Sequence, residues 1–388
     1  MRTAIRGGTV LLDDRLTRAD IYVCREGNSG RIASIDCEIE CDCVLDATGL
    51  LVLPALVDIH GDAFERQIEP RPGVVFDLEI ALLETDRQLV ANGIATAFHG
   101  VTWSWEPGLR DTENAHAMLA AIERLRPRLA ADTRIHLRHE TFNLDAETTI
   151  IEWLSGHRID CFAFNDHMTG TIKERHRPEK IAGMIRRTGL DAAEFGALVD
   201  RVYARRAEVP GSMTRLALAA SAAGVPTLSH DDRDTETRDW FRARAVTISE
   251  FPVTAEVAAA ASNSGDATVF GAPNVVRGGS HTGCPSAAEM VARGHCTMLA
   301  SDYYYPALLQ APFRLAADGV EELASAWHLV SRNPSVALGL TDRGVIDVGM
   351  RADIVLVAAG VDRSPCVVAT IVDGRIGHLA DGALLRSP

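Results

Sequence analysis

The stretch from Leu50 to Asp62 constrains the fold of this chain most strongly. Residues 50–57 form an unbroken apolar run, which is too short to span a bilayer and typical of a strand buried on both faces of a parallel sheet. The run leads into His60 and Asp62, which lie two residues apart and so share one face of the strand. An imidazole and a carboxylate placed in this way can bind one divalent cation. Such a pair alone is more often an ordinary hydrogen-bonded strand end, so a metal site requires further ligands elsewhere in the chain.

Buried-strand candidates alternate with helical stretches through the middle of the chain. After the first run, they are residues 94–99, 135–140, 161–166, 226–230, 246–250, 268–271 and 297–302. Residues 113–129, 191–206 and 254–262 have helical composition. With the first run the strands number eight, as in a closed (β/α)8 barrel. We therefore predict an α/β fold with a TIM-like (β/α)8 barrel over residues 53–340, whose longest insertion lies between residues 166 and 227.

The two ends of the chain have a different pattern. Residues 9–12, 20–24 and 31–35 are short strand-like runs separated by turns, and residues 353–357 and 365–374 repeat this pattern near the C-terminus. Neither end has enough strands to close a hydrophobic core alone, whereas a shared sheet could bury both. We predict that residues 1–52 and 341–388 together form one small β-sandwich domain.

The charge and composition of the chain argue against several classes of protein. A net charge of -14 disfavours binding to nucleic acid or to acidic membrane surfaces. No apolar run approaches the roughly 18 residues of a transmembrane helix, and the N-terminus has no apolar core of signal-peptide length. The 8 cysteines include no CxxC pair. These features favour a cytoplasmic enzyme that acts on a small molecule, and they leave open whether it is a homo-oligomer.

Polar side chains that can bind metal gather at the ends of the predicted strands. Because the carboxyl ends of all strands of a barrel meet at one mouth, these side chains are expected to converge. They are His60, Asp62, Glu140, Asp166, His167, His230, Asp231, Asp232 and Asp302. Each alone has an ordinary alternative as a helix cap or a hydrogen-bonded strand end. Together they predict a centre for one or two divalent metal ions, zinc first with manganese or iron(II) as alternatives, in which a glutamate can bridge two ions.

Longer motifs carry a resemblance to a known family. The sequences Leu-Pro-x-x-Val-Asp-x-His at residues 53–60, Ser-Asp at 301–302 and the two runs 331–340 and 343–356 resemble the amidohydrolase superfamily over nearly the full length. Within it, the diphosphatases of phosphonate catabolism, which act on a phosphonylated ribose triphosphate, are similar in five motifs. These are Asp-x-His-x-Asp-x-x-Glu-Arg at 58–66, Pro-Arg-Pro-Gly at 70–73, His-Leu-Arg-x-Glu at 136–140, Asp-His at 166–167 and Gly-Ala-Pro-Asn-Val-Val-Arg-Gly-Gly-Ser-His at 271–281.

The resemblance implies a set of metal ligands. They are His60, Asp62, Glu140, His167, His230 and Asp302. Two of these positions differ from the usual superfamily pattern. Asp62 stands where a second histidine is common, and Glu140 stands in for the common carboxylated lysine, as in the sugar-phosphate deacetylases. Glu140 is therefore the expected bridging ligand.

The chemistry of such a centre is the activation of water. A divalent ion lowers the pKa of a bound water, and Asp302 is the expected catalytic residue that accepts the proton and passes it to the leaving group. Attack could fall on a carbonyl carbon or on a phosphorus. Cationic side chains in the mouth motifs favour a polyanionic substrate, because guanidinium groups match phosphate oxygens. The predicted substrate-binding residues are Arg66, Arg71, Arg138, Arg277 and His281.

Three functions are compatible with these residues. The first is metal-dependent hydrolysis of a phosphoanhydride with release of diphosphate. The second is C–N hydrolysis, as in a deacetylase, a deaminase or a cyclic amidase. The third is a metal-free assembly subunit that has kept the fold, against which the intact ligand set speaks. The arginines favour the first function, although they could instead form salt bridges with Glu65, Glu69 and other carboxylates.

Overall fold

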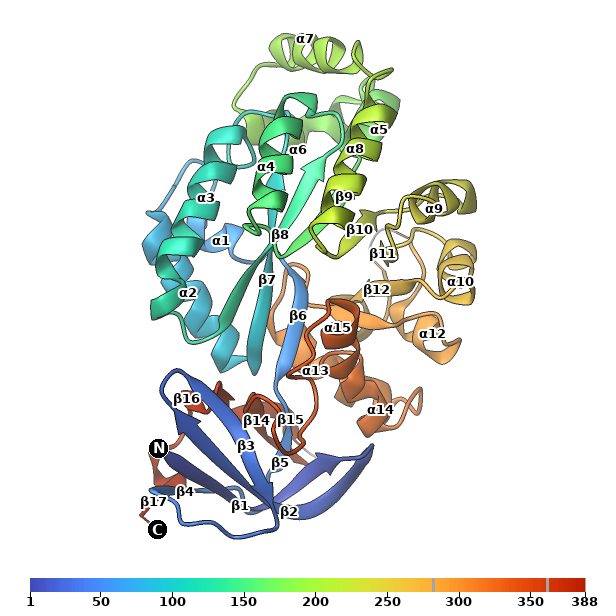
Figure 1. The fold of residues 1–388 in the computed structure, drawn as a ribbon. Helices are drawn as coiled ribbons and strands as arrows, with labels where there is room; N and C mark the ends of the chain where they lie inside the picture. Colours follow the sequence, from blue (N-terminus) through green and yellow to red (C-terminus); the bar gives the residue numbers. More distant parts are fainter. Residues whose placement is uncertain (281–282, 361–362, 388) are drawn as a thin grey trace.

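Eight parallel strands form the centre of the molecule, and neighbours in the sheet are neighbours in the chain (Figure 1). The computed structural model describes residues 1–280, 283–360 and 363–387. The strands are β6 (Leu56–Gly61), β7 (Ile94–Trp103), β8 (Asp132–Glu140), β9 (Cys161–Asn165), β10 (Thr227–His230), β11 (Ile248–Glu250), β12 (Ala267–Gly271) and β13 (Met298–Ala300). The predicted (β/α)8 barrel is confirmed, with one correction: most of the apolar run 50–57 forms β5 (Leu51–Pro54) of a second sheet, and the first barrel strand begins only at Leu56.

Helices follow the strands and cover the outside of the barrel (Figure 1). They are α1 (Glu65–Ile68), α2 (Leu78–Ala91), α3 (Thr112–Leu125), α4 (Glu147–Ser155), α5 (His167–Glu174), α6 (Pro178–Thr188), α7 (Ala192–Tyr203), α8 (Val209–Ala222), α9 (Thr235–Arg242), α10 (Ala255–Asn263), α11 (Ala272–Arg277), α12 (Ala287–Ala292), α13 (Pro306–Ala317), α14 (Leu323–His328) and α15 (Arg332–Ala337). Aspartates cap several of them. The side chains of Asp77, Asp111 and Asp234 accept backbone N–H groups in the first turns of α2, α3 and α9, which fixes where these helices begin.

The interior of the barrel is apolar below and polar at the mouth. Side chains along a strand alternate between its two faces, so every second residue points inward. On β9, Cys161 and Ala163 belong to the buried cluster inside the barrel, and Asn165 follows on the same face at the mouth. On β11, Ile248 belongs to that cluster and Glu250 follows. This alternation places the polar strand ends above an apolar plug.

The barrel closes between its first strand, β6, and its last strand, β13. At the mouth, the amide of Asp302 donates to the carbonyl oxygen of His60 at 2.9 Å, and the amide of Asp62 donates to the carbonyl oxygen of Asp302 at 3.0 Å. Deeper down, the linker between α14 and α15 offers its carbonyl oxygens to the amides of Val57 and Leu299, both at 2.9 Å. The seam is therefore held by backbone hydrogen bonds at the mouth and by this linker below.

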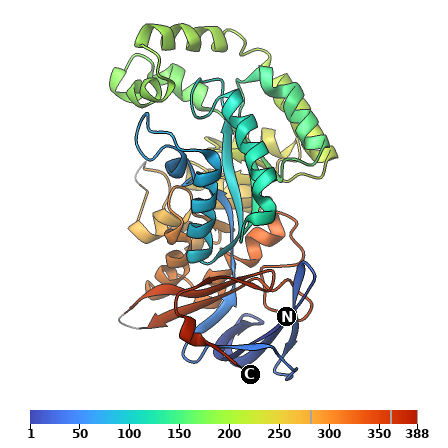
Figure 2. The ribbon, with the colours of Figure 1, turned by 90° about the vertical axis from the view of Figure 1, so that its left-hand side faces the viewer.

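Helices α5 to α7 form the long insertion that was predicted between residues 166 and 227. They project beyond the mouth of the barrel (Figure 2). Met168, Phe195 and Val199 form the centre of a small hydrophobic cluster of their own. Arg187 on α6 donates two hydrogen bonds to Oε2 of the buried Glu106, which lies after β7, at 2.7 and 3.1 Å. The insertion is thus tied to the barrel by an ion pair as well as by apolar packing.

Both ends of the chain contribute to a second, separate sheet below the barrel, as predicted (Figure 1). Its strands are β1 (Arg2–Leu12), β2 (Arg15–Glu26), β3 (Ser29–Ile35), β4 (Cys43–Asp46), β5 (Leu51–Pro54), β14 (Ile354–Gly360), β15 (Arg363–Val372), β16 (Arg375–Leu379) and β17 (Leu385–Arg386). The main path runs β16-β15-β14-β5-β1-β2-β3, so β14 from the C-terminal end pairs with β5 from the N-terminal end. The division into domains at residues 52 and 341 stays a proposal.

The segment that leads from the barrel back to this sheet is held by a buried arginine. Nη1 of Arg343 donates to Oγ1 of Thr96 at 2.8 Å and to Oδ2 of Asp132 at 2.6 Å, both at the lower ends of barrel strands. The same guanidinium lies 3.8 Å from Asp353, which precedes β14. Arg343 therefore connects the bottom of the barrel to the second sheet. Within the described ranges, no helix has both the length and the apolar character needed to cross a membrane.

Candidate metal centre

Three side chains from distant parts of the chain meet inside the mouth of the barrel. His60 on β6, His136 on β8 and Glu250 on β11 are 1%, 0% and 0% exposed, and one ligand atom of each lies within 4.8 Å of the others. His60, Asp62 and Asp302 form a second group by the same measure. His60 belongs to both groups. Two candidate cation positions thus share one imidazole.

The hydrogen bonds around the first group leave nitrogen lone pairs free for a cation. Nδ1 of His60 lies 2.7 Å from Oε1 of Glu250, and Nδ1 of His136 lies 3.0 Å from the carbonyl oxygen of Ile59. Carboxylate and carbonyl oxygens only accept, so each Nδ1 carries the hydrogen and each Nε2 presents a lone pair. A histidine whose second nitrogen donates to a carboxylate or carbonyl is the usual form of a histidine ligand.

The unsatisfied atoms of this group fit a divalent metal ion. Among the residues that the structure describes, Nε2 of His136 and Oε2 of Glu250 are buried without a hydrogen-bond partner. Buried polar atoms without partners are rare, because they cost free energy that water would otherwise supply. Imidazole nitrogens combined with carboxylate oxygens suit zinc, manganese and iron(II). The residues present therefore fit such an ion.

The charges of the first group reinforce one another. Burial alone would raise the pKa of Glu250, but its interaction with the His60 imidazole, which is hydrogen-bonded to it, outweighs burial and holds that pKa well below its usual range. Burial alone would lower the pKa of His60, but the charge of Glu250 outweighs it and raises that pKa. Burial lowers the pKa of His136 to about 3, so this imidazole is neutral at physiological pH. A permanent carboxylate thus faces a neutral imidazole ligand.

Two glycines make room for this arrangement. A Cβ atom on Gly61 would lie 2.8 Å from Oδ2 of Asp58 and 2.9 Å from Cε1 of Tyr305, which is closer than such atoms approach. A Cβ atom on Gly100 of β7 would lie 3.1 Å from Cδ of Arg138. The absence of a side chain at these two positions lets Asp58 and Arg138 reach into the barrel.

A buried carboxylate joins the first strand to the last beneath the candidate site. Asp58 accepts a hydrogen bond from Oγ of Ser301 at 2.5 Å and another from the amide of Ser301 at 3.0 Å. Burial raises the pKa of Asp58, and these two hydrogen bonds oppose that shift. Because Ser301 directly precedes Asp302, this contact fixes the position of the predicted catalytic aspartate. Burial also raises the pKa of Asp302.

Two of the predicted ligands pair with each other instead of joining these groups. Nδ1 of His167 lies 2.5 Å from Oε1 of Glu140, and the amide of His167 donates to Oε2 at 3.2 Å. Burial would raise the pKa of Glu140, but His167 and then Arg138 lower it to about 2. Within the described residues, neither Glu140 nor His167 belongs to the two groups built on His60.

Arg138 lies among the predicted ligands and is only 5% exposed. Its Nη2 lies 3.1 Å from Nε2 of His230, and its Nη1 lies 3.8 Å from Oδ2 of Asp62. Nδ1 of His230 lies 3.2 Å from Oδ2 of Asp231. The guanidinium therefore contacts predicted ligands at the ends of β6 and β10, and its positive charge faces them.

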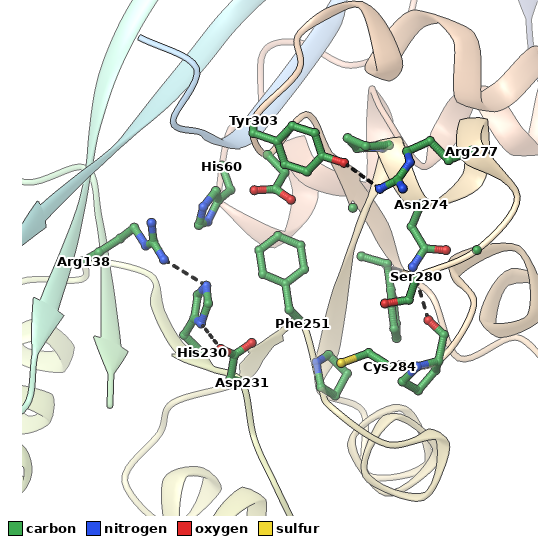
Figure 3. Close-up of a pocket in the computed structure, with 17 residues that line it drawn as sticks. His60, Arg138, His230, Asp231, Phe251, Asn274, Arg277, Ser280, Cys284 and Tyr303 are labelled. Carbon is green, nitrogen blue, oxygen red and sulfur yellow. Dashed lines mark hydrogen bonds and ion pairs between the residues drawn. The ribbon is translucent and has the colours of Figure 1, made fainter. Parts of the chain in front are cut away.

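A cavity of about 240 Å³ opens beside His60 and His230 (Figure 3). Figure 3 shows the ring of Phe251 between His230 and Tyr303, with Arg277 beyond Tyr303. Nη1 of Arg277 donates to the hydroxyl oxygen of Tyr303 at 3.4 Å.

Arg66 is not among the described residues that line the cavity, but its guanidinium lies 5.9 Å from the centre of the ring of Tyr303, which does line it. Arg277 and Arg66 are thus gathered around the residue that follows Asp302.

Two other predicted substrate-binding residues, Arg71 and His281, are not found at the cavity among the described residues. Arg71 is exposed in the loop before α2 and is not among the described residues that line the cavity. His281 lies outside the described residues.

The sequence also allowed salt bridges between the predicted arginines and Glu65 or Glu69. Glu65 instead accepts hydrogen bonds of 2.9 and 3.0 Å from Arg110. Glu69 accepts the amide of Gly73 at 2.6 Å. Both carboxylates therefore have partners other than the predicted arginines.

A buried polar network holds the ends of β10 and β11 from outside the barrel. Oδ2 of Asp232 accepts hydrogen bonds from Ser229 and Ser249, both at 2.7 Å, and from Nη1 of the fully buried Arg238 at 3.1 Å. Ser229 directly precedes His230, and Ser249 directly precedes Glu250. The network thus positions two residues of the site without touching the cavity of Figure 3.

Sequence reasoning missed His136 and Glu250 as candidate ligands. His136 lies four residues before Glu140 on the same strand face, and Glu250 ends the sixth barrel strand as Glu140 ends the third. Reading inward-facing positions below the strand ends, and reading every strand end, would have found both. Neither belongs to a motif whose residue types alone indicate metal binding.

Comparison with known proteins gives the class. Residues 164–377 match the model of the amidohydrolase family, and the chain belongs to this family. It is 32% identical over 321 residues to the alpha-D-ribose 1-methylphosphonate 5-triphosphate diphosphatase of Escherichia coli (strain K12), which covers 80% of this chain and 84% of that enzyme. An adenine deaminase of Methylobacterium nodulans is 27% identical over 395 residues, which cover 98% of this chain and 58% of that enzyme.

Solved structures agree on the fold. An amidohydrolase from an environmental sample of the Sargasso Sea aligns with a TM-score of 0.65 at 15% identity, covering 98% of this chain and 93% of that one. Molinate hydrolase aligns with a TM-score of 0.62 at 14% identity, covering 97% and 94%. At these identities the likeness concerns the fold alone. The family match and the relative from Escherichia coli show that the chain is a hydrolase of the amidohydrolase superfamily.

Proposed function

We propose that this hydrolase is a cytoplasmic enzyme of phosphonate catabolism, which cleaves a phosphoanhydride of alpha-D-ribose 1-methylphosphonate 5-triphosphate and releases diphosphate. The relative from Escherichia coli that bears this activity in its name supports the proposal, since the match extends over most of both chains. The observation that carries it is the pair of arginines around Tyr303, of which Arg277 lines the cavity. Arg66 and Arg277 gather around Tyr303, directly beside the predicted catalytic Asp302.

The two arginines suit the charge of such a substrate. Both guanidinium groups are exposed, and within the described residues neither has a carboxylate partner at salt-bridge distance. They are therefore available for phosphate oxygens, which a guanidinium binds through two parallel hydrogen bonds. The diphosphate leaving group carries most of the negative charge that develops during cleavage. Arg277 and Arg66 would stabilise that charge, with Arg71 and His281 proposed as further contacts from the same mouth.

We propose that the centre holds one or two divalent metal ions, with zinc first and manganese or iron(II) as alternatives. The proposed ligands are His60, His136 and Glu250 for one position and His60, Asp62 and Asp302 for the other, with Glu140, His167 and His230 kept as further candidate ligands. When bound, such an ion lowers the pKa of water and offsets charge on phosphate oxygens. We include His136 and Glu250 as ligands because each has a buried atom that lacks a hydrogen-bond partner among the described residues.

Asp302 is the proposed general base and acid. Burial raises its pKa toward the range in which a carboxylate accepts a proton and later returns it. Its backbone has a φ of 54°, which turns it away from the direction of β13 at the mouth. The hydrogen bond from its amide to the carbonyl oxygen of His60 fixes that turn. Asp302 would take the proton from the attacking water and pass it toward the leaving oxygen.

The test is a product analysis of the metal-reconstituted protein. We expect triphosphates of ribose to yield diphosphate in a single step, without orthophosphate appearing first. The same protein is given N-acetyl sugars, adenine and cyclic amides, because the adenine deaminase relative favours C–N hydrolysis as the second candidate. Release of amine or ammonia in place of diphosphate would assign the second function. Folded protein that binds no metal and turns over neither class would indicate a scaffold.

A further inference from the structure

A second cavity meets the first at His230 and Asp231. It has a volume of about 480 Å³ and lies between the ends of β8, β9 and β10 and the helices α8 and α9. His230 and Asp231 line both cavities. A ligand whose reacting atom lies near His230 can therefore extend in two directions, one toward Arg277 and the other into this second cavity.

Asn165 borders the second cavity from the end of β9. Asn165 is 1% exposed and lines this cavity. Within the part of the chain that the structure describes, its amide nitrogen and amide oxygen are both buried and have no hydrogen-bond partner. A buried amide without partners costs on the order of 1–3 kcal/mol. Such an amide donates and accepts at once, as required to bind a hydroxyl group. The arrangement points to a neutral polar group of a ligand.

The other polar walls of the second cavity support a neutral group over a charged one. Asp166 and Asp234 cap the first turns of α5 and α9 through their side chains. Asp232 is held by Arg238, and Arg233 donates to the carbonyl oxygen of Asp166 at 3.1 Å. These charged groups are therefore already engaged. Of the other charged residues in the wall, Arg206 donates to the carbonyl oxygen of Tyr203 and Asp231 faces His230, while Glu236 is exposed. The remaining wall includes two threonine hydroxyls and the apolar surface of an indole, from Thr141, Thr169 and Trp240.

We propose that the second cavity is the subsite for the sugar ring of the substrate, with the amide of Asn165 binding ring hydroxyls. Hydroxyl groups and an apolar ring face match the amide, the threonines and the indole of this wall. The ring would lie in the second cavity while the departing diphosphate lies toward Arg277, so that the bond to be cleaved falls near His230 between them. This assignment rests on the proposed diphosphatase function.

Binding of two phosphates tests the subsite without any turnover. D-ribose 5-phosphate and methyl phosphate differ only in the sugar, and calorimetric titration of the metal-reconstituted full chain gives both dissociation constants. We expect the ribose compound to bind at least about tenfold more tightly. In Asn165→Leu, which keeps the branched shape of the side chain and removes the amide, this preference should fall to within about twofold. The exposed Asn263 on α10 supplies the control, because Asn263→Leu should keep the full preference.

The stability of the variant separates a binding amide from a structural one. An amide without protein partners costs stability, so Asn165→Leu should unfold at the same temperature as the wild type or a higher one. Equal affinity of the wild type for the two phosphates, or a preference that survives in Asn165→Leu, would overturn the subsite. Failure to hydrolyse D-ribose 5-triphosphate, with the sugar preference intact, would instead refute the diphosphatase function and leave the subsite standing.

Discussion

Nδ1 of His60 lies 2.7 Å from Oε1 of Glu250, although 190 positions separate the two residues in the chain and neither is exposed to solvent. The pair is the centre of the first ligand group. Its formation depends on closure of the barrel, because β6 and β11 are not neighbours in the sheet. Metal binding and correct folding are thus expected to depend on the same contact.

Replacing Glu250 with glutamine should remove most of the bound metal. The change keeps the size of the side chain, but it removes the charge that faces His60 and one proposed ligand oxygen. Elemental analysis after reconstitution with zinc, manganese and iron(II) measures the effect. We expect less than half of the wild-type metal content, while Glu256→Gln on the exposed face of α10 should match the wild type. Equal metal in both variants would exclude Glu250 as a ligand.

Asp302→Asn should abolish turnover while substrate binding largely remains. The amide keeps the shape of the side chain but cannot accept a proton, so we expect the turnover number to fall by about 100-fold or more. The dissociation constant for diphosphate, measured in the same preparation, should change by less than about threefold. A variant that keeps its turnover number would remove Asp302 from the proton transfer.

Arg277→Ala should weaken binding and turnover together. Loss of a charged donor to phosphate corresponds to about 2 kcal/mol, which is roughly a 30-fold loss in kcat/KM on a triphosphate. Arg293→Ala, which removes an exposed arginine paired with Glu289, is the control and should have no effect on kinetics. Unchanged kinetics in Arg277→Ala would move the C–N hydrolase to first place.

Removal of residues 345–388 should destabilise the N-terminal strands. It deletes β14, which pairs with β5, and β5 in turn pairs with β1. It also removes Asp353 from beside Arg343. Hydrogen exchange at residues 4–35 should therefore become faster in the truncated protein. Unchanged exchange there would show that the two ends are independent, and would refute the proposed shared domain.

The buried His99 should make stability depend on pH. Burial lowers its pKa from 6.5 to about 4, so between these values the unfolded chain binds a proton that the folded chain does not. This contribution to stability is full above pH 6.5 and is lost as the pH falls toward 4. In His99→Leu, the slope of unfolding free energy against pH in this window should decrease by about 1.4 kcal/mol per pH unit. Denaturant titrations at several pH values measure it, and an identical slope would contradict the prediction.

Much of the fold could be predicted because it depends on local patterns. Apolar runs of strand length, each ending in polar residues, predicted the positions of β7 to β13, and residues such as His60 and Asp302 were expected at the mouth for this reason. The first run, 50–57, is the exception, because most of it pairs in the second sheet as β5. The pairing of β14 with β5 could be expected only in outline. Its register depends on side chains packed between two distant segments, which no local pattern records.

The contacts within the site could not be predicted, because they depend on distances across the barrel. The spacing of Arg138 between His136 and Glu140 showed that all three share a face, but not that the guanidinium would contact His230 at 3.1 Å. Likewise, the expectation that Glu140 bridges two ions did not indicate that its Oε1 would lie 2.5 Å from Nδ1 of His167. These contacts depend on how the strands come together when the barrel closes, and residue types alone do not indicate them.

The contact between the first and last barrel strands at Gly61 and Asp302 couples ion binding at the proposed site to the stability of the folded protein. The hydrogen bonds that join the first barrel strand to the last at the mouth involve His60, Asp62 and Asp302, which are also proposed to bind the ion. A ligand held by these three residues opposes separation of the strands, and it stabilises the folded state by mass action. Protein deprived of its ion should consequently open first at this seam, and such molecules would be the ones that proteases remove.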